Sequence, residues 1–299
     1  MIRKSGDNTK GIIFLLGSAL LYSIMPILIR FLGSGHVPPM SQVFLRYIFA
    51  FLSALVYFII TKSKFALSKN TIVFLVLVAV FGYALTNLFF TYGIIYTEVS
   101  NGLFIFYCFS IITPILGYFI LKEKANRYNL IALAVTLLAL LLLFRPNSFA
   151  TWKIGGFSAL LSAFGQSFYL ISRKKLPQYS SQLLLLVSTF VGVLVLGVLS
   201  LSFEHSFYAG GNGITTLAPN TWLVTVLFGI DNFLAWLLMS KGFQYIKSAL
   251  GSILLLSELL FATLLAFLFF REIPGMYATF GGVLVIISSI LIILKGDNS

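Results

Sequence analysis

Residues 11–32 read GIIFLLGSALLYSIMPILIRFL, an apolar run of about the length that a helix needs to cross a lipid bilayer. Residues 155–176, in the second half of the chain, read GGFSALLSAFGQSFYLISRKKL and follow the same pattern at an offset of 144 positions. Five pairs of identical residues coincide at this offset: Gly11 and Gly155, Ser18 and Ser162, Ala19 and Ala163, Ser23 and Ser167, and Leu32 and Leu176. The match goes beyond shared apolar composition and predicts that the two halves are copies of one membrane-spanning unit.

The composition of the whole chain is that of a membrane protein. Of its 299 residues 59% are hydrophobic and 9% are charged, whereas about 25% are charged in an average soluble domain. These values exclude a water-soluble globule. The first apolar run is expected to be a retained anchor, because no convincing small-residue cleavage site follows it. Charged or turn-forming clusters separate ten predicted helices, at residues 12–32, 41–60, 72–93, 100–121, 128–144, 154–173, 180–202, 221–243, 248–270 and 275–294.

A second offset, of 149 positions, relates the later helices of the two halves. It pairs Gly93 with Gly242, Tyr96 with Tyr245, Gly102 with Gly251, Lys122-Glu123 with Arg271-Glu272, and Tyr128 with Tyr277. Each half therefore holds five helices, and because five is odd, corresponding helices run in opposite directions. The predicted fold is an all-α membrane protein of ten transmembrane helices in two inverted five-helix repeats. That architecture is common among secondary transporters, which bind substrate near the midplane at the repeat interface.

The charge of the chain is strongly positive, with 20 Lys and Arg against 8 Asp and Glu and a net charge of +12. In a soluble protein this excess would suggest nucleic acid, but cytoplasmic loops of membrane proteins also collect basic residues. Assigning these residues to alternate ends of the ten helices divides them 15 to 5, which predicts that both termini are cytoplasmic. Arg173 is counted with the cytoplasmic loops, and Arg46 with the outer end of the second helix.

Two acidic residues are predicted near the centre of the bilayer. Asp231 and Glu258 each lie about ten residues into their helices, roughly 15 Å along the axis. An ionised acid at that depth costs about 2.5 to 3.5 kcal/mol, so it normally faces a bundle interior or a wet cavity. No basic residue is predicted at the same depth. The two acids are therefore expected to carry a proton, to meet a cationic group such as a substrate amine, or to exchange protons during transport, with a purely structural hydrogen bond as the alternative for each.

Three further helices carry polar residues in a single stripe at a spacing of four. The stripes are Ser18, Tyr22 and Pro26; Tyr83, Asn87 and Thr91; and Ser158, Ser162 and Gln166. Polar side chains in hydrocarbon face one another or a cavity. The first, third, sixth, eighth and ninth helices are thus predicted to surround a pathway. The structural alternative is interhelical hydrogen bonding, worth about 0.6 kcal/mol per contact.

Aromatic residues complete the candidate site. Tyr92, Tyr96, Tyr107 and Trp236 are candidates for walls around an apolar or cationic ligand, although most aromatic residues in this chain must pack in the core or face lipid. Pro26 and Pro114 are predicted to bend their helices, as hinges or as static kinks. The candidate substrate-binding residues are Glu258, Asp231, Asn87, Gln166, Tyr22, Ser162, Tyr83, Tyr96 and Trp236.

Several kinds of chemistry find no support in the sequence. His36 and His205 have no Cys, Asp or Glu nearby at metal-ligand spacing, and the single Cys108 allows no intrachain disulfide. No phosphate-binding loop with a following Lys and Ser or Thr occurs. We therefore predict no catalytic residue, no metal and no cofactor, and we expect transport to use an ion or solute gradient or to be facilitated diffusion.

Residues 11–145 and 155–294 resemble the two five-helix repeats of the EamA family in the drug/metabolite transporter superfamily. The resemblance rests on Pro114 within Thr113-Pro114-Ile115, on the helix endings Lys122-Glu123 and Arg271-Glu272, and on Glu258. Glu258-Leu259 stands where the family usually has Glu-Pro. The resemblance implies an exporter of amino acids or related metabolites.

The sequence thus predicts a multi-pass protein of the bacterial inner membrane that moves small metabolites by alternating access. The expected partners are a small-molecule substrate and the lipid bilayer, without nucleic acid, in a monomer or homodimer. A lipid or lipid-linked sugar flippase is the first alternative. An intramembrane enzyme is the second, but it would need acids, histidines or arginines clustered near one interface, and this chain disperses them.

Overall fold

The computed structural model describes residues 5–97, 99–122, 127–144, 154–209, 213–270 and 276–295, and all the regular structure in these ranges is helical. The first half contains α1 (Ser5–Tyr22), α2 (Met25–Ser34), α3 (Pro39–Ile60), α4 (Ile72–Leu77), the π-helical η1 (Val78–Ala84), α5 (Leu85–Tyr96), α6 (Val99–Tyr107), α7 (Phe109–Leu121) and α8 (Arg127–Phe144). The second half contains α9 (Ile154–Lys175), α10 (Ser181–Phe203), α11 (His205–Ala209), the 3₁₀-helical η3 (Ile214–Thr216), α12 (Pro219–Tyr245), α13 (Ser248–Leu254), α14 (Ser257–Phe270) and α15 (Met276–Lys295).

These elements form the ten predicted spans within the described residues. Six segments are individually long and apolar enough to cross a membrane: Asn8–Ser34, Pro39–Ile60, Ile72–Tyr96, Ile154–Lys175, Ser181–Phe203 and Pro219–Tyr245. The other four spans are α6 with α7, α8, α13 with α14, and α15. Large apolar side chains such as Phe119 and Phe203 are 72% and 73% exposed on the bundle surface, as expected where lipid replaces water.

Three of the spans are broken near their middle. The first is interrupted between Tyr22 and Met25, next to Pro26, which lacks the backbone N–H that would continue the helix. This break agrees with the bend predicted at Pro26. In the fourth span the interruption lies at Cys108, whereas Pro114 sits inside the continuous helix α7. The fourth and ninth spans break at corresponding positions of the two halves, because α13 and α14 follow one another as α6 and α7 do.

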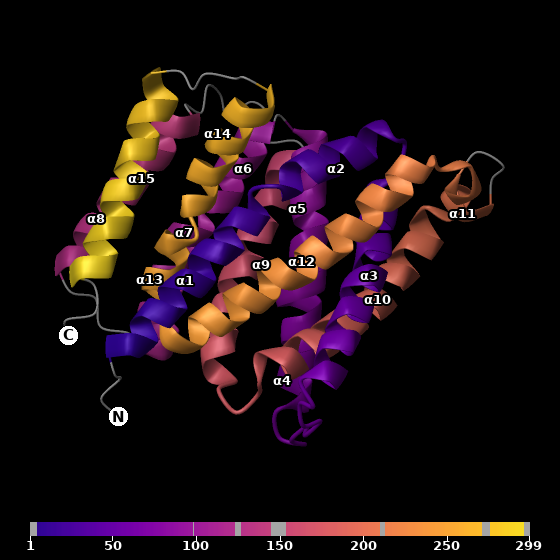
Figure 1. Ribbon diagram of the computed structural model, residues 1–299, viewed down its shortest axis with the longest axis horizontal. Helices are drawn as coiled ribbons and strands as arrows, with labels where there is room; N and C mark the ends of the chain where they lie inside the picture. The colour runs from indigo at the N-terminus through magenta and orange to yellow at the C-terminus, as the bar shows by residue number, and fades with distance from the viewer. Residues whose placement is uncertain are drawn as a thin grey trace.

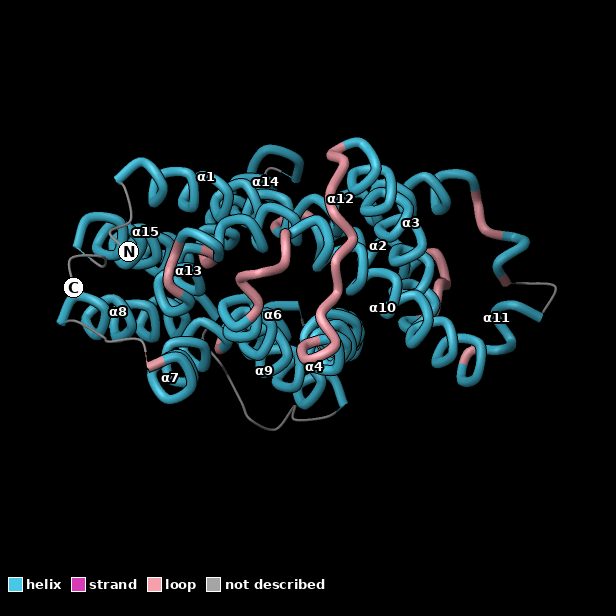
Figure 2. The backbone as a smooth tube through the Cα atoms, turned by 90° about the horizontal axis from the view of Figure 1, so that it is seen from below, coloured by secondary structure: helices cyan, strands magenta, loops and turns pink. Residues whose placement is uncertain are grey.

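The helix pairings are symmetric between the two halves. The first span of each half packs on the third span of the other, α1 on α12 and α9 on α5. The second spans pack together as α3 and α10, and the fifth spans as α8 and α15. Figure 1 and Figure 2 show α8 and α15 at one end of the bundle and α3 and α10 at the other. Exchanging the halves thus restores the same set of neighbours, as expected of two copies of one unit related by a two-fold axis.

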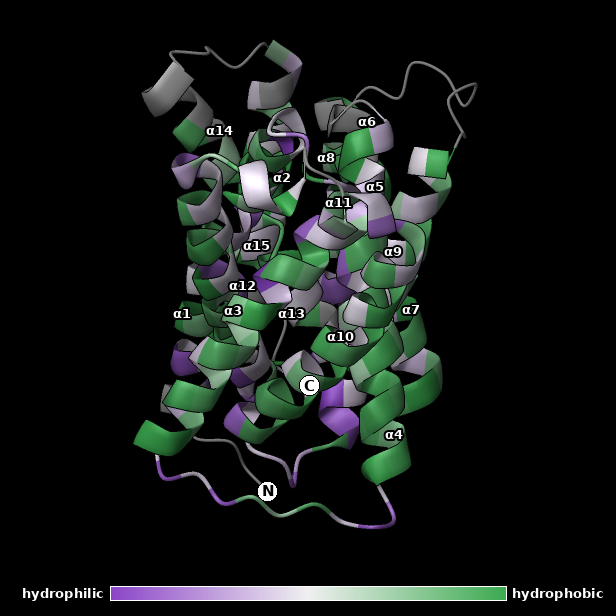
Figure 3. Ribbon diagram, turned by 90° about the vertical axis from the view of Figure 1, so that its right-hand side faces the viewer, coloured by the Kyte–Doolittle hydropathy of each residue, from purple (hydrophilic) through white to green (hydrophobic). Residues whose placement is uncertain are grey.

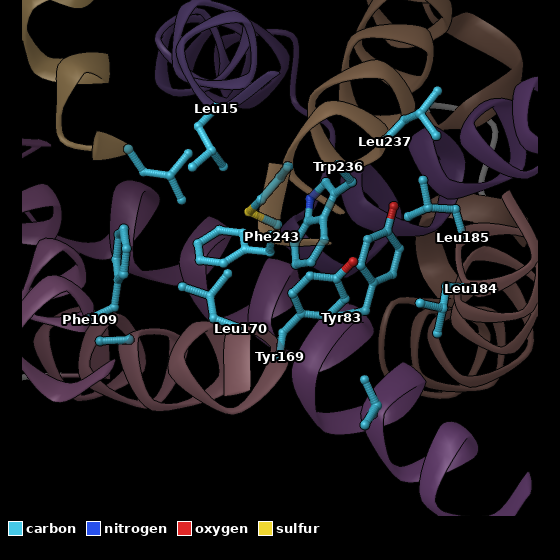
Figure 4. Close-up of a cluster of buried hydrophobic side chains, with 14 of the residues drawn as sticks. Leu15, Tyr83, Phe109, Tyr169, Leu170, Leu184, Leu185, Trp236, Leu237 and Phe243 are labelled. Carbon is cyan, nitrogen blue, oxygen red and sulfur yellow. The ribbon is translucent and has the colours of Figure 1, made fainter. Parts of the chain in front are cut away.

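The interior contains two separate clusters of buried apolar side chains. The larger includes Leu15, Tyr169, Trp236 and Phe243, and part of it is shown in Figure 4. The smaller includes Met25, Ile29, Leu32, Val37, Leu45, Phe90, Ile94, Phe207, Phe228 and Ala235. Figure 3 shows that apolar residues dominate the helices, while hydrophilic residues gather in the connection nearest the N-terminus and between helices in the interior.

Two arginines lie inside the bundle, contrary to their predicted places at the helix ends. Arg46 is 0% exposed and Arg173 is 2% exposed. α9 continues two residues past the predicted end of its helix, to Lys175, so that Arg173 lies on a helix face and bonds to α12. Arg46 is the eighth residue of α3, and its long side chain reaches Asn87 in the first turn of α5. The position of an arginine in the sequence predicts the depth of its backbone only. Its guanidinium group lies several ångströms from its own Cα and can reach a different depth.

Candidate functional site

A small cavity lies where the broken helices meet. Its lining residues are Tyr22, Met25, Thr86, Asn87, Phe90, Phe106, Gln166, Trp236 and Glu258. The space open to the centres of water-sized molecules is about 20 Å³, enough for about one water molecule. The lining comes from the first, third, fourth, sixth, eighth and ninth spans, so both halves contribute. All five spans predicted to surround a pathway are among them, and the fourth was not predicted.

Five of the nine candidate residues line this cavity: Tyr22, Asn87, Gln166, Trp236 and Glu258. Two more lie directly behind its wall. The Ser162 hydroxyl donates to the Thr86 carbonyl at 2.9 Å, and the Tyr83 ring packs edge-on against Trp236 with centroids 4.1 Å apart.

The remaining two candidates, Asp231 and Tyr96, are not brought to the cavity. Tyr96 ends α5, is 52% exposed and stacks on Tyr92 at 5.3 Å between ring centroids. Asp231 is partly exposed, and its Oδ2 is buried without a hydrogen-bond partner in the part of the chain that the structure describes.

Glu258 sits at the break in the ninth span. It is 4% exposed and occupies the first turn of α14, where the unpaired N–H groups of a helix favour negative charge. The Tyr107 hydroxyl donates a hydrogen bond to its carboxylate, and Tyr107 ends α6 at the corresponding break of the fourth span. The two breaks therefore meet across this bond, and discontinuous helices of this kind form binding sites in transporters with inverted repeats.

A buried polar network surrounds Asn87. Its Oδ1 accepts hydrogen bonds from Arg46 Nη2 at 2.9 Å and from Asn232 Nδ2 at 3.2 Å, and its own Nδ2 donates to the Tyr83 carbonyl at 3.0 Å. The Tyr83 hydroxyl closes the chain by donating to Asn232 Oδ1 at 3.3 Å. Since both halves supply members, the network joins the repeats directly behind the cavity.

Arg46 corrects the expectation that no basic residue reaches the depth of the acids. Its guanidinium lies 4.5 Å above the Phe228 ring, and its Nε and Nη1 have no hydrogen-bond partner among the described residues. Asn232 was also not predicted as a site residue, because the adjacent acid Asp231, which lies on a neighbouring face of α12, was chosen instead. Asn232 and Trp236 are four residues apart and share one face of α12, a spacing that would have pointed to Asn232.

Aromatic and sulfur-containing side chains pack around the cavity-lining residues Trp236, Gln166 and Tyr22. Figure 4 shows Trp236 beside Tyr83 and Tyr169, and the Tyr169 ring centroid is 4.5 Å from that of Trp236. Met239 Sδ accepts hydrogen bonds from Gln166 Nε2 at 3.3 Å and from the Tyr22 hydroxyl at 3.7 Å. Trp236 thus contributes an aromatic side chain to the lining, and Gln166 and Tyr22 contribute an amide and a hydroxyl group.

Both apolar clusters contribute residues to the lining of the cavity. Met25 and Phe90 belong to the smaller cluster, and Phe106 packs on Phe90 with ring centroids 4.6 Å apart. Trp236 belongs to the larger cluster. Apolar side chains of both clusters therefore border the cavity. Among the described residues no group of three or more His, Cys, Asp or Glu side chains is placed to hold a metal ion.

Known proteins resemble the chain over nearly its full length. The sequence model of the EamA-like transporter family matches residues 9–145 and again residues 153–294. An uncharacterized transporter of Clostridium kluyveri is 25% identical over 294 residues, which cover 94% of this chain and 92% of that protein. Human solute carrier family 35 member G1 is 23% identical over 93% of this chain and 77% of its own length. A solved structure described as "Crystal structure of protein" superposes with a TM-score of 0.79 at 14% identity, covering 95% of this chain and 98% of that one.

Proposed function

Because this chain belongs to the EamA-like transporter family, we propose that it exports small metabolites such as amino acids by alternating access through the central cavity. The family consists of transporters, so the chain is a multi-pass membrane transporter and not an enzyme. What we propose beyond family membership is the class of solute, the outward direction of transport and the route through the central cavity.

The observation that carries the proposal is the cavity between the broken helices, which is lined by residues of both halves. A solute site that opens to each side in turn needs a pocket in the middle of the bilayer and a movable barrier on either side of it. Here the barriers are the two apolar clusters, and the breaks at Tyr22–Met25, at Cys108 and before Ser257 supply points at which half-helices can tilt. Opening one cluster while the other stays packed would expose the cavity to one side only.

The side chains around the cavity favour a solute that carries an amino group. Glu258 is the carboxylate in the lining and would face the ammonium group, while Trp236 and Tyr22 would pack on the apolar part of the solute. The amides of Asn87 and Gln166 are suited to hydrogen-bonding the solute carboxylate, and the charge of Arg46 lies directly behind Asn87. With room for about one water, the site must widen when it takes up a solute.

We further propose that the protein lies in a bacterial inner membrane with both termini in the cytoplasm, as the 15 to 5 division of basic residues suggests. Moving the buried Arg46 and Arg173 out of the count leaves 14 to 4, so the asymmetry survives the correction. Two five-helix repeats, residues 11–145 and 155–294, would act as the moving units, in a monomer or homodimer, driven by a proton or solute gradient.

The test is uptake of radiolabelled amino acids into proteoliposomes that contain the purified full chain, with counterflow used to show exchange. The proposal predicts saturable transport that Glu258→Gln reduces at least tenfold without changing the amount of folded protein. A second variant, Tyr22→Phe, removes a hydroxyl from the cavity lining and should also reduce transport. Its matched control is Tyr96→Phe, which removes a hydroxyl from an exposed tyrosine outside the cavity and should leave transport unchanged. Transport of a lipid analogue in place of amino acids would support the flippase alternative, and normal transport by Glu258→Gln would contradict the assigned role of this residue.

A further inference from the structure

The buried guanidinium of Arg46 has more hydrogen-bond donors than the surrounding protein accepts from. Its Nη2 donates to Oδ1 and to the main-chain carbonyl of Asn87, at 2.9 Å and 3.4 Å. Its Nε and Nη1, which carry most of the N–H groups of a guanidinium, are buried and have no hydrogen-bond partner in the part of the chain that the structure describes. Because unpaired donors of a buried charged group are costly, the arrangement favours a further acceptor.

Neither of the other groups close to Arg46 supplies that acceptor. Asp231 on α12 interacts electrostatically with Arg46, but its Oδ2 is itself buried without a hydrogen-bond partner among the described residues. The Phe228 ring lies 4.5 Å from the guanidinium, a contact that stabilises a cation through the face of the ring. The charge of Arg46 is therefore balanced at a distance, while its N–H groups remain available to an anion.

The side chain of Asn87 stands between Arg46 and the central cavity. Asn87 lines that cavity, and its Oδ1 accepts from Arg46 Nη2 at 2.9 Å and from Asn232 Nδ2 at 3.2 Å. An oxygen that accepts from a guanidinium and from an amide has the surroundings that suit a carboxylate oxygen. If the Asn87 amide turns aside, a carboxylate that enters from the cavity meets the same two donors.

The face of α12 that carries Asn232 adds another donor at the cavity. Trp236 lines the cavity and lies four residues after Asn232 on that face. Its indole Nε1, which can only donate, is buried and has no hydrogen-bond partner among the described residues. Tyr83 contacts both: its hydroxyl donates to Asn232 Oδ1 at 3.3 Å, and its ring packs on that of Trp236 at 4.1 Å between centroids. Donors without acceptors on Arg46 and Trp236 suit a negatively charged ligand.

We propose that Arg46, Asn232 and Trp236 bind the carboxylate of the transported solute. Asn87 Oδ1 holds the position of one carboxylate oxygen while the cavity has room for only about one water molecule, and the widening of the cavity includes the turning of this side chain. The inference rests on the function proposed above and deepens it, because it names Arg46, which lies behind the lining, as the partner of the carboxylate, while Glu258 takes the ammonium group.

The test measures the midpoint of thermal unfolding of the full chain in phosphatidylcholine nanodiscs, at constant ionic strength, with two halves of alanine as probes. Propionate keeps the carboxylate and lacks the amino group, and ethylamine keeps the amino group and lacks the carboxylate. A ligand that binds only the folded protein raises the midpoint. We expect a saturable rise with each probe, the rise with propionate depending on Arg46 and the rise with ethylamine depending on Glu258.

Asn87→Asp is the decisive variant because it places a permanent carboxylate oxygen beside Arg46. The Tyr83 carbonyl, to which the Asn87 amide donates, still accepts from the Tyr47 hydroxyl at 3.0 Å. We expect the half-saturating propionate concentration to rise about tenfold, since the donors are already used, and the response to ethylamine to persist. Asn220→Asp is the matched control: it makes the same change at an exposed position at the start of α12 and should keep the propionate concentration within twofold.

A second variant, Arg46→Met, should lose the response to propionate and keep the response to ethylamine. The carboxylate site is overturned if propionate does not raise the midpoint of the unmodified chain, or if Asn87→Asp and Asn220→Asp change the response equally. Transport in proteoliposomes separates this inference from the proposed function. A chain that transports alanine and fails with propionate refutes the carboxylate site alone, whereas a chain that binds propionate as expected and transports no amino acid refutes the proposed function alone.

Discussion

Removing the Asn87 amide should uncouple Arg46 from the rest of the central network. Asn87→Leu keeps the size of the side chain but deletes Oδ1, which accepts from Arg46 Nη2 at 2.9 Å and from Asn232 Nδ2 at 3.2 Å. A hydrogen bond to a charged group contributes about 1.5 to 3 kcal/mol and a neutral one about 0.5 to 1.5 kcal/mol. Asn87→Leu should therefore lower the free energy of unfolding by about 2 to 4 kcal/mol.

A double-mutant cycle separates the Arg46 bond from the other losses. The cycle compares Asn87→Leu, Arg46→Met and the double variant by equilibrium unfolding in mixed detergent micelles. The contact between Arg46 and the Phe228 ring is lost in both legs that remove Arg46, so it cancels, and the coupling energy reports the bond between Arg46 and Asn87. We expect a coupling of about 1.5 to 3 kcal/mol. A coupling below about 0.5 kcal/mol would refute the reasoning, because the buried cation would then not depend on the amide.

Substitutions at three further residues test other parts of the structure. The Glu204 carboxylate accepts from the Met40 N–H at 2.9 Å, the Ser41 N–H at 2.6 Å and the Ser41 hydroxyl at 2.7 Å. Glu204→Ala should therefore destabilise the start of α3 by about 1 to 3 kcal/mol and lower the melting midpoint, with Glu204→Gln intermediate. If the two variants melt at the midpoint of the unmodified protein, Glu204 does not cap α3. Gly93→Ala places a Cβ 3.0 Å from the Ala159 Cβ and should separate α5 from α9 at a cost of about 1 to 3 kcal/mol. Gly33→Ala places a Cβ at an ordinary contact distance of 3.7 Å from Gln42 Nε2, so it should be neutral or slightly stabilising by helix propensity. If Gly93→Ala and Gly33→Ala change the melting midpoint equally, the close approach of α5 and α9 is not the cause.

The sequence predicts the depth of a residue in the membrane better than its direction. The charged and turn-forming clusters between apolar runs predicted the ten spans, and the matching Gly, Ser and Tyr positions predicted that the second half repeats the first. Glu258 was predicted as a site residue from its depth, and Asn87 and Gln166 from polar stripes at a spacing of four; all three line the cavity.

What the sequence did not predict concerns direction around the helix axis and the reach of long side chains. Adjacent residues on a helix point about 100° apart, so Asp231 and Asn232 share a depth, but it is Asn232 that joins the network beside the cavity. Arg46 and Arg173 were placed at the helix ends by their backbone positions, yet their side chains reach buried partners. The π-helical turn that carries Tyr83 has no signal in the apolar pattern.

The central claim is that one cavity is reached from each side of the membrane in turn. The most direct measurement is labelling of Thr86→Cys, in a chain whose single native cysteine is replaced by Cys108→Ser, with a membrane-impermeant thiol reagent applied to right-side-out and to inside-out vesicles. Thr86 lines the cavity and is 2% exposed. The account predicts slow labelling from both faces, slowed further by a transported solute. Labelling from one face only, or from neither, would contradict it.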